Sequence, residues 1–171
     1  REGIAARRDE LAAMSDADFD LPCMTPVGPG TYGRFMDVRV FDFWVHEQDI
    51  RRPLGLPGHE DGPAAETAIA EIEASLGYII GRKVGLPDGR SITIDLTGPV
   101  DRMVHVAVDG RAGQVDALGA ADVTLRTDST TFALLACGRI DPQGTIDEGQ
   151  VEWDGDGEWG ERAARNLAFT M

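Results

Sequence analysis

Residues 35–52 read FMDVRVFDFWVHEQDIRR, and this stretch constrains the fold most strongly. Its apolar side chains recur at helical spacing, which predicts an amphipathic helix with one buried face. Pro53 and the glycine-rich residues 55–62 end the helix, because proline cannot continue a helical hydrogen-bond ladder. The side chains expected to pack beside the polar face are Phe35, Val38, Val45 and Ile50.

Three chemically active side chains share one face of this predicted helix. Asp42, His46 and Asp49 stand at positions i, i+4 and i+7, so they project in one direction. A carboxylate and an imidazole one turn apart can bind a divalent metal together, if a third protein ligand comes from elsewhere. The alternative is an ordinary Asp–His hydrogen bond on a helix surface. The zinc-protease motif is excluded, because Ile50 stands where that motif needs its second histidine.

The rest of the N-terminal half also reads as mainly helical. Residues 1–14 carry apolar side chains at helical spacing, residues 20–34 read as a long loop, and residues 63–83 form another amphipathic helix. Such helices pack into bundles, but two and a half helices are too few to close one. We therefore expect a helical domain over residues 1–84 from which N-terminal helices are missing.

The periodicity changes from helix to strand after Gly85. Apolar and polar residues alternate over 91–97 and 103–108, a turn at Asp109-Gly110 leads into 111–117, and a further strand covers 122–127. Residues 129–137 form a helix, 151–153 a last short strand and 158–169 a last helix. Strands with helices packed on one face make an α+β domain, predicted here over residues 85–171.

The composition argues against two classes of partner. Acidic residues outnumber basic ones by 30 to 16, giving a formal charge of −14. Nucleic acids and anionic membranes are bound by clustered Lys and Arg, so we expect neither as a partner. Cys23 and Cys137 are too few and too far apart for a disulfide framework, and the sequence has neither a signal peptide nor a membrane-spanning run. These features predict a cytoplasmic protein.

The stretch Asp42–Gly55, DFWVHEQDIRRPLG, resembles the signature helix of the mycothiol-dependent maleylpyruvate isomerase family. The C-terminal half resembles the same family through DVTL at 122–125, FALLACGR at 132–139 and VEWDGD at 151–156. The resemblance implies an α+β protein: a DinB-like four-helix metal-binding domain, here partial, followed by a domain resembling the sterol-carrier-protein fold.

The resemblance also implies metal ligands. The family's acid and histidine, four residues apart, fall on Asp42 and His46 and would bind zinc; the usual acid is Glu, one methylene longer than Asp42. The family's first ligand is a histidine on an earlier helix, which this sequence lacks. His59, in a Pro/Gly loop, and His105, on a strand, do not fill that role. We therefore expect either a fragment of a longer protein, since Arg1 stands where an initiator Met would be, or an incomplete site.

Several other residues have both a functional and a purely structural explanation. Arg139 matches an arginine that the family uses for activity, and it could hold a carboxylate with bidentate geometry; as a cation at a helix end it is also favourable for structure alone. Asp49 could orient His46 by a hydrogen bond or simply be solvated. Trp44 is expected in the core, and His105 facing solvent or a neighbour. Nothing near Cys23 would make it a nucleophile.

The function implied by the resemblance is a mycothiol-dependent, metal-assisted isomerase or thiol transferase acting on a small electrophilic substrate. A divalent metal, zinc by resemblance, favours the thiolate of mycothiol at neutral pH. In the isomerase itself the thiolate would add to the double bond of maleylpyruvate, and rotation and elimination would follow. The alternative is a non-catalytic binding protein that uses the C-terminal α+β domain for an apolar ligand or a partner.

Overall fold

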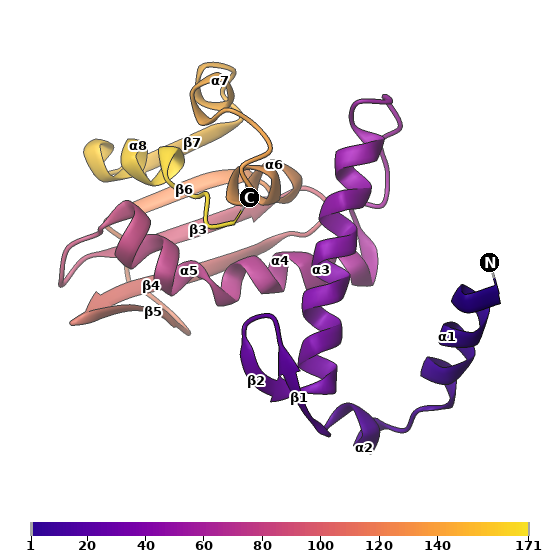
Figure 1. Ribbon diagram of the computed structural model, residues 1–171. Helices are drawn as coiled ribbons and strands as arrows, with labels where there is room; N and C mark the ends of the chain where they lie inside the picture. Colours follow the sequence, from indigo (N-terminus) through magenta and orange to yellow (C-terminus); the bar gives the residue numbers. More distant parts are fainter. Residues whose placement is uncertain (1, 171) are drawn as a thin grey trace.

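The computed structural model describes residues 2–170, and their N-terminal part is built around one long helix (Figure 1). This part contains, in order, α1 (Glu2–Ala13), α2 (Asp16–Phe19), β1 (Pro22–Thr25), β2 (Gly28–Thr31) and α3 (Tyr32–Arg51). Helix α1 stands apart from the sheet in Figure 1, and its side chains are almost all exposed. Helix α3 lies between α1 and the sheet-bearing part of the molecule, and it begins where Thr31 accepts a hydrogen bond from the Arg34 amide at 3.1 Å.

The segment expected as a loop over residues 20–34 is instead a small antiparallel hairpin followed by the first turn of α3. Pro26 and Val27 connect the two strands, and Gly28 takes a φ of +114°, which favours glycine. The Thr25 hydroxyl donates to the Gly28 carbonyl at 2.7 Å and closes the turn. Proline at the first loop position and glycine at its end are turn signals that the loop prediction did not use.

The helix predicted over residues 63–83 is interrupted. Helix α4 (Gly62–Ala74) ends at Ser75, a three-residue turn α5 (Leu76–Tyr78) follows, and η1 (Ile79–Val84) is a π-helical segment. The interruption falls at Ser75 and is followed by Gly77, both weak helix formers. Gly77 packs closely against the sheet, since a Cβ there would lie 2.9 Å from the Ala112 carbonyl oxygen.

The C-terminal part contains a five-stranded sheet in the order β5-β4-β3-β6-β7. Neighbouring strands are antiparallel except β3 and β6, which run parallel. The strands are β3 (Ser91–Thr97), β4 (Arg102–Asp109), β5 (Arg111–Val115), β6 (Val123–Asp128) and β7 (Val151–Gly155). The predicted strand positions are confirmed to within two residues, because alternation along each strand records which side chains face the core.

Helices cover one face of this sheet and bury its apolar side chains. They are α4, η1, α6 (Ser129–Ala136) and α8 (Gly157–Arg165), while α7 (Pro142–Asp147) lies beside β7 and α8. Side chains such as Ile92, Ile94 and Leu125 are fully buried in this core. The short helix α7 was not predicted: Asp141 accepts a hydrogen bond from the Gly144 amide and Pro142 opens the first turn, but six residues are too few for a periodic pattern.

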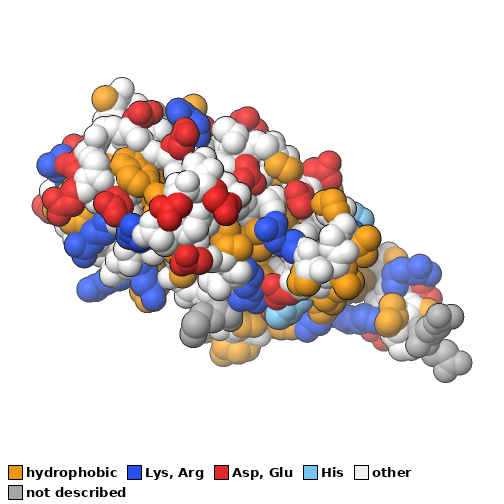
Figure 2. Space-filling view, turned by 90° about the horizontal axis from the view of Figure 1, so that it is seen from above, with side chains coloured by type: hydrophobic (Ala, Val, Ile, Leu, Met, Phe, Trp, Pro, Cys, Tyr) orange, Lys and Arg blue, Asp and Glu red, His pale blue; other side chains and the backbone are white. Residues whose placement is uncertain are grey.

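The α+β class expected from the sequence is therefore confirmed. The division at residues 84 and 85 stays a prediction, since α4 packs against α3 on one side and against α6 on the other. Within residues 2–170, no helix combines the length and the apolar character needed to cross a bilayer. Figure 2 shows acidic side chains distributed over the face seen from above, with basic side chains lying among them.

The half-buried carboxyl of Glu73 on α4 gives a pH-dependent stability prediction. Burial raises the pKa of Glu73 to about 7, although the Arg102 guanidinium lies 3.2 Å away. Between pH 4.5 and 7 the folded chain holds a proton that the unfolded chain has lost, so the free energy of unfolding falls as pH rises. Glu73→Gln should match wild type near pH 5 and exceed its stability by about 1–3 kcal/mol at pH 8.

Denaturant unfolding of both proteins at the two pH values checks this. Glu66→Gln is the matched control, because Glu66 pairs with the same arginine but is half exposed, and the substitution should not make the protein more stable than wild type at pH 8. If Glu73→Gln is instead less stable than wild type at pH 8, the ionised Glu73–Arg102 pair stabilises the fold and the prediction is wrong.

Candidate functional site

The Asp42, His46 and Asp49 side chains lie together on one face of α3, as their spacing predicts. His46 Nε2 lies 3.5 Å from Asp42 Oδ1, and His46 Nδ1 lies 3.1 Å from Asp49 Oδ2. The two ring nitrogens therefore face different carboxylates. The side chains of Asp42 and His46 are 63% and 59% exposed, which leaves room for further ligands beside them.

Arg139 reaches this face from the end of α6. Gly138 follows α6 with a φ of +65°, and the Arg139 amide donates to the Leu134 carbonyl at 2.8 Å, which turns the chain toward α3. The guanidinium then pairs with Asp49 through two hydrogen bonds, Nε to Oδ1 at 3.0 Å and Nη2 to Oδ2 at 3.2 Å. Its Nη1 donates to the Cys137 carbonyl at 2.7 Å. Arg139 thus contacts the His46 face through Asp49 and does not point into solvent.

The electrostatics of this group hold Asp49 in its ionised form. The hydrogen bonds from Arg139 lower the pKa of Asp49, and the contact with His46 adds to the effect. The same pairing raises the pKa of Arg139. An ionised Asp49 can accept a proton carried on Nδ1 of His46, and Nε2 of the same ring faces Asp42.

The donors on α3 fit a divalent metal in type and spacing, but they are only two. Two ligands of a tetrahedral zinc at 2.0–2.2 Å lie about 3.4 Å apart, close to the 3.5 Å between Asp42 Oδ1 and His46 Nε2. Over residues 2–170, no group of three or more His, Cys, Asp or Glu side chains is arranged to hold a metal. A zinc site with three protein ligands therefore needs one more donor than this part of the chain brings together.

The other two histidines lie elsewhere, as the sequence suggested. His59 Nδ1 contacts Glu47 Oε1 at 2.6 Å, and its backbone carbonyl accepts a hydrogen bond from the indole of Trp44 at 2.7 Å. His105 on β4 contacts the Thr93 hydroxyl at 2.9 Å. Trp44 is buried, as expected, whereas Ile50, expected to pack, is largely exposed on the outer face of α3.

Sequence reasoning missed one member of the site. A small cavity of about 60 Å³ is lined by Phe41, Asp42, Val45, His46, Cys137, Arg139 and Thr170. Burial raises the pKa of the Cys137 thiol to about 11, so this side chain is an inert wall at neutral pH. The usable signal was the position of Cys137 two residues before the candidate residue Arg139, at the end of the predicted helix over residues 129–137.

The fold and this site define a class: an α+β protein whose acid–histidine pair on a long helix is approached by an arginine from the sheet-bearing part. Comparison with family models makes the class specific. The model of the MDMPI C-terminal domain matches residues 66–162, more than half of the chain, and the mycothiol maleylpyruvate isomerase N-terminal domain matches residues 1–51. The chain belongs to the mycothiol maleylpyruvate isomerase family.

Other comparisons give weaker likenesses. A UbiJ-SCP2 ubiquinone synthesis protein is 19% identical, with 63% of this chain and 100% of that chain covered and a TM-score of 0.45. Sterol carrier protein 2 from Yarrowia lipolytica is 14% identical over 60% and 93% of the two chains, with a TM-score of 0.39. Sterol carrier protein 2 like 2 from Aedes aegypti is 17% identical over 58% and 93%, with a TM-score of 0.41. None of the curated proteins compared with this chain matches it.

Proposed function

We propose that this chain carries the active site of a mycothiol-dependent, metal-assisted isomerase or thiol transferase that acts on a small electrophilic substrate. The observation that carries the proposal is the continuous line of contacts from Asp42 through His46 and Asp49 to Arg139. This line of contacts joins α3 to the sheet-bearing part, and the metal-donor side chains of Asp42 and His46 are exposed at its α3 end. Family membership supports the thiol as partner, and we propose the cytoplasm as its location.

In this proposal Asp42 and His46 hold the metal, zinc by preference, and a third donor completes the site. A divalent metal bound there would supply a Lewis acid that favours the thiolate form of a thiol at neutral pH. Asp49 fixes the His46 ring by accepting its Nδ1–H, and Arg139 holds Asp49 in place with two hydrogen bonds.

Arg139 has a further capacity that suits a substrate-binding role. A guanidinium carries five N–H donors, of which three are used by Asp49 and the Cys137 carbonyl. Within the part of the chain that the structure describes, two donors therefore stay without a protein acceptor. We propose that they hold an anionic group of the substrate beside His46, with the planar geometry that arginine offers to carboxylates.

Thiol dependence tests the proposal directly. The purified protein, loaded with zinc, is assayed with maleylpyruvate for isomerisation and with 1-chloro-2,4-dinitrobenzene for thiol transfer, each with and without mycothiol. We expect turnover in at least one assay only when mycothiol is present, and loss of that turnover with a chelator. Rates that are the same without mycothiol would contradict the proposal.

A further inference from the structure

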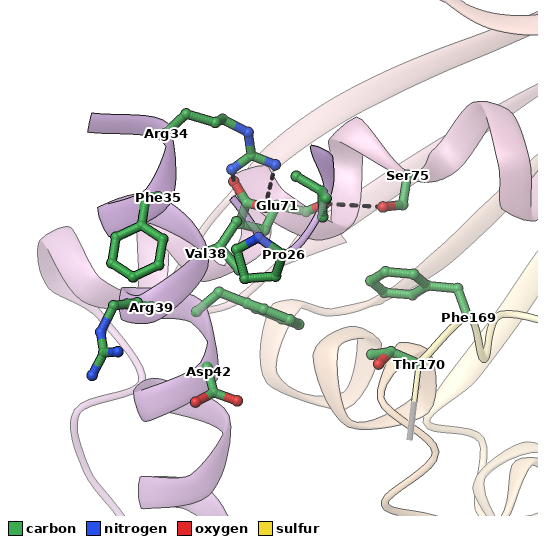
Figure 3. Close-up of a pocket in the computed structure, with 12 residues that line it drawn as sticks. Pro26, Arg34, Phe35, Val38, Arg39, Asp42, Glu71, Ser75, Phe169 and Thr170 are labelled. Carbon is green, nitrogen blue, oxygen red and sulfur yellow. Dashed lines mark hydrogen bonds and ion pairs between the residues drawn. The ribbon is translucent and has the colours of Figure 1, made fainter. Parts of the chain in front are cut away.

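A larger cavity lies beside the candidate site and has no role in the scheme above. It measures about 430 Å³, within the range of small-molecule pockets, is open to solvent, and is lined by residues of the hairpin turn, α3, α4 and the C-terminal segment (Figure 3). Its apolar lining consists of Pro26, Val27, Phe35, Val38, Phe41 and Phe169. In Figure 3, Phe169 and Thr170 lie across the hollow from Val38 and Asp42.

This cavity adjoins the acid–histidine pair. Phe41, Asp42 and Thr170 line both it and the small cavity that contains His46 and Arg139. A molecule seated in the larger cavity therefore reaches the donors of α3 at Asp42. One side of the shared boundary is the stacked pair of Phe41 and Phe169, whose ring centroids are 6.5 Å apart with planes inclined by 28°.

Of the two arginines that line this cavity, Arg34 is paired with an acid and Arg39 is directed away from Phe169. Arg34 pairs with Glu71, including a 2.8 Å hydrogen bond from Nη2 to Oε2, so the two charges cancel. The Arg39 guanidinium lies over the rings of Phe35 and Phe43, at 5.6 and 4.9 Å from their centroids, and Figure 3 shows it directed away from Phe169. Asp42, at the boundary, is an acid. An anionic group thus gains little here, whereas an apolar group is removed from water.

We propose that this cavity binds an uncharged apolar end, such as an aryl group, of the electrophilic substrate, with the Phe41–Phe169 pair setting its width. The inference rests on the proposed function for the identity of the ligand as substrate. It assigns the two ends of that substrate to different places: the apolar end beside Val38, and any carboxylate at Arg139. The substrate class is then an aryl- or alkyl-substituted electrophile rather than a compact dicarboxylate.

The test uses a fluorescent probe that needs neither thiol nor metal. N-phenyl-1-naphthylamine, an uncharged aromatic compound, is titrated into the wild-type protein and into Val38→Asp. A carboxylate placed in an apolar pocket should weaken probe binding by at least about 10-fold. The matched control is Val115→Asp, at a partly exposed valine on β5 outside this cavity, which should stay within about twofold of wild type.

A second variant guards against loss of folding in the first. Phe169→Ser removes one wall of the cavity from a segment beyond the last helix, and it should weaken probe binding by about fivefold or more. Benzylideneacetone, an uncharged aryl enone, should displace the probe from wild type, whereas sodium maleate at the same concentration should not. Binding that is unchanged in both cavity variants, or displaced equally by maleate, overturns the inference.

The outcome is separable from that of the proposed function. Probe binding that depends on Val38, combined with no thiol-dependent turnover, would defeat the proposed function and leave an apolar ligand site. Thiol-dependent turnover, combined with probe binding that is unchanged in Val38→Asp and Phe169→Ser, would contradict the cavity assignment and leave the proposed function standing. His46→Ala should bind the probe like wild type, because His46 does not line this cavity.

Discussion

Arg139→Ala is expected to lower mycothiol-dependent turnover by about 10²-fold while the zinc content stays unchanged, a loss of the size caused by a mispositioned substrate. The reason is that Arg139 joins the end of α6 to the Asp49–His46 contacts and has two N–H donors that no described residue accepts. Arg139→Lys should recover little, because an ammonium lacks the planar fork that makes two parallel hydrogen bonds. Steady-state kinetics and elemental analysis measure both quantities.

The matched control is Arg126→Ala, an arginine on β6 paired with Asp95, which should leave turnover unchanged. Asp49→Asn then separates two roles for Arg139. If Arg139 binds an anionic substrate directly, Arg139→Ala raises KM and Asp49→Asn has the smaller effect. If Arg139 acts only through Asp49, Arg139→Ala and Asp49→Asn both lower kcat and shift the pH profile of kcat in the same way. Turnover of Arg139→Ala within about twofold of wild type would refute both roles.

In a longer chain that supplies the third donor, His46→Ala is expected to abolish zinc binding, from about one ion per chain to none, because the imidazole is one of the two donors that α3 offers. Turnover should fall by at least about 10³-fold, since a bound metal contributes several kcal/mol of charge stabilisation. Elemental analysis after dialysis gives the stoichiometry. His105→Ala is the control: His105 contacts Thr93 on the sheet and should keep the metal. Equal zinc in wild type and His46→Ala would rule out the ligand assignment.

The sequence predicted the local elements well wherever burial follows a simple period. The strands at 91–97 and 123–128 lie within a residue of their expected positions, since apolar and polar residues alternate along each of them in the sequence. The single helix predicted over 63–83 is interrupted at Ser75, next to the close contact between Gly77 and Ala112. That contact joins residues 35 positions apart, which periodicity does not record.

The candidate site likewise has a part that the sequence predicts and a part that depends on contacts between distant residues. The common face of Asp42, His46 and Asp49 follows from helical spacing, because all three lie within eight residues of one helix. The pairing of Asp49 with Arg139 spans 90 positions in the sequence and depends on the turn at Gly138. The adjoining cavity depends on the β1–β2 turn and on residues near the C-terminus, which meet only in the folded chain.

One carboxylate oxygen is shared between the two halves of the site, and this has a thermodynamic consequence. Asp49 Oδ2 contacts His46 Nδ1 at 3.1 Å and accepts from Arg139 Nη2 at 3.2 Å. A ligand bound to His46 changes the strength of the hydrogen bond between the imidazole and that oxygen. It therefore also changes the strength of the Asp49–Arg139 pair, which connects α3 to the end of α6. Reciprocity of coupling free energies requires the converse: whatever pulls Arg139 away alters the affinity of His46 for its ligand by the same factor. The strength of the contact between the sheet-bearing part and α3, and the binding of a ligand to His46 on α3, are thus coupled through one equilibrium.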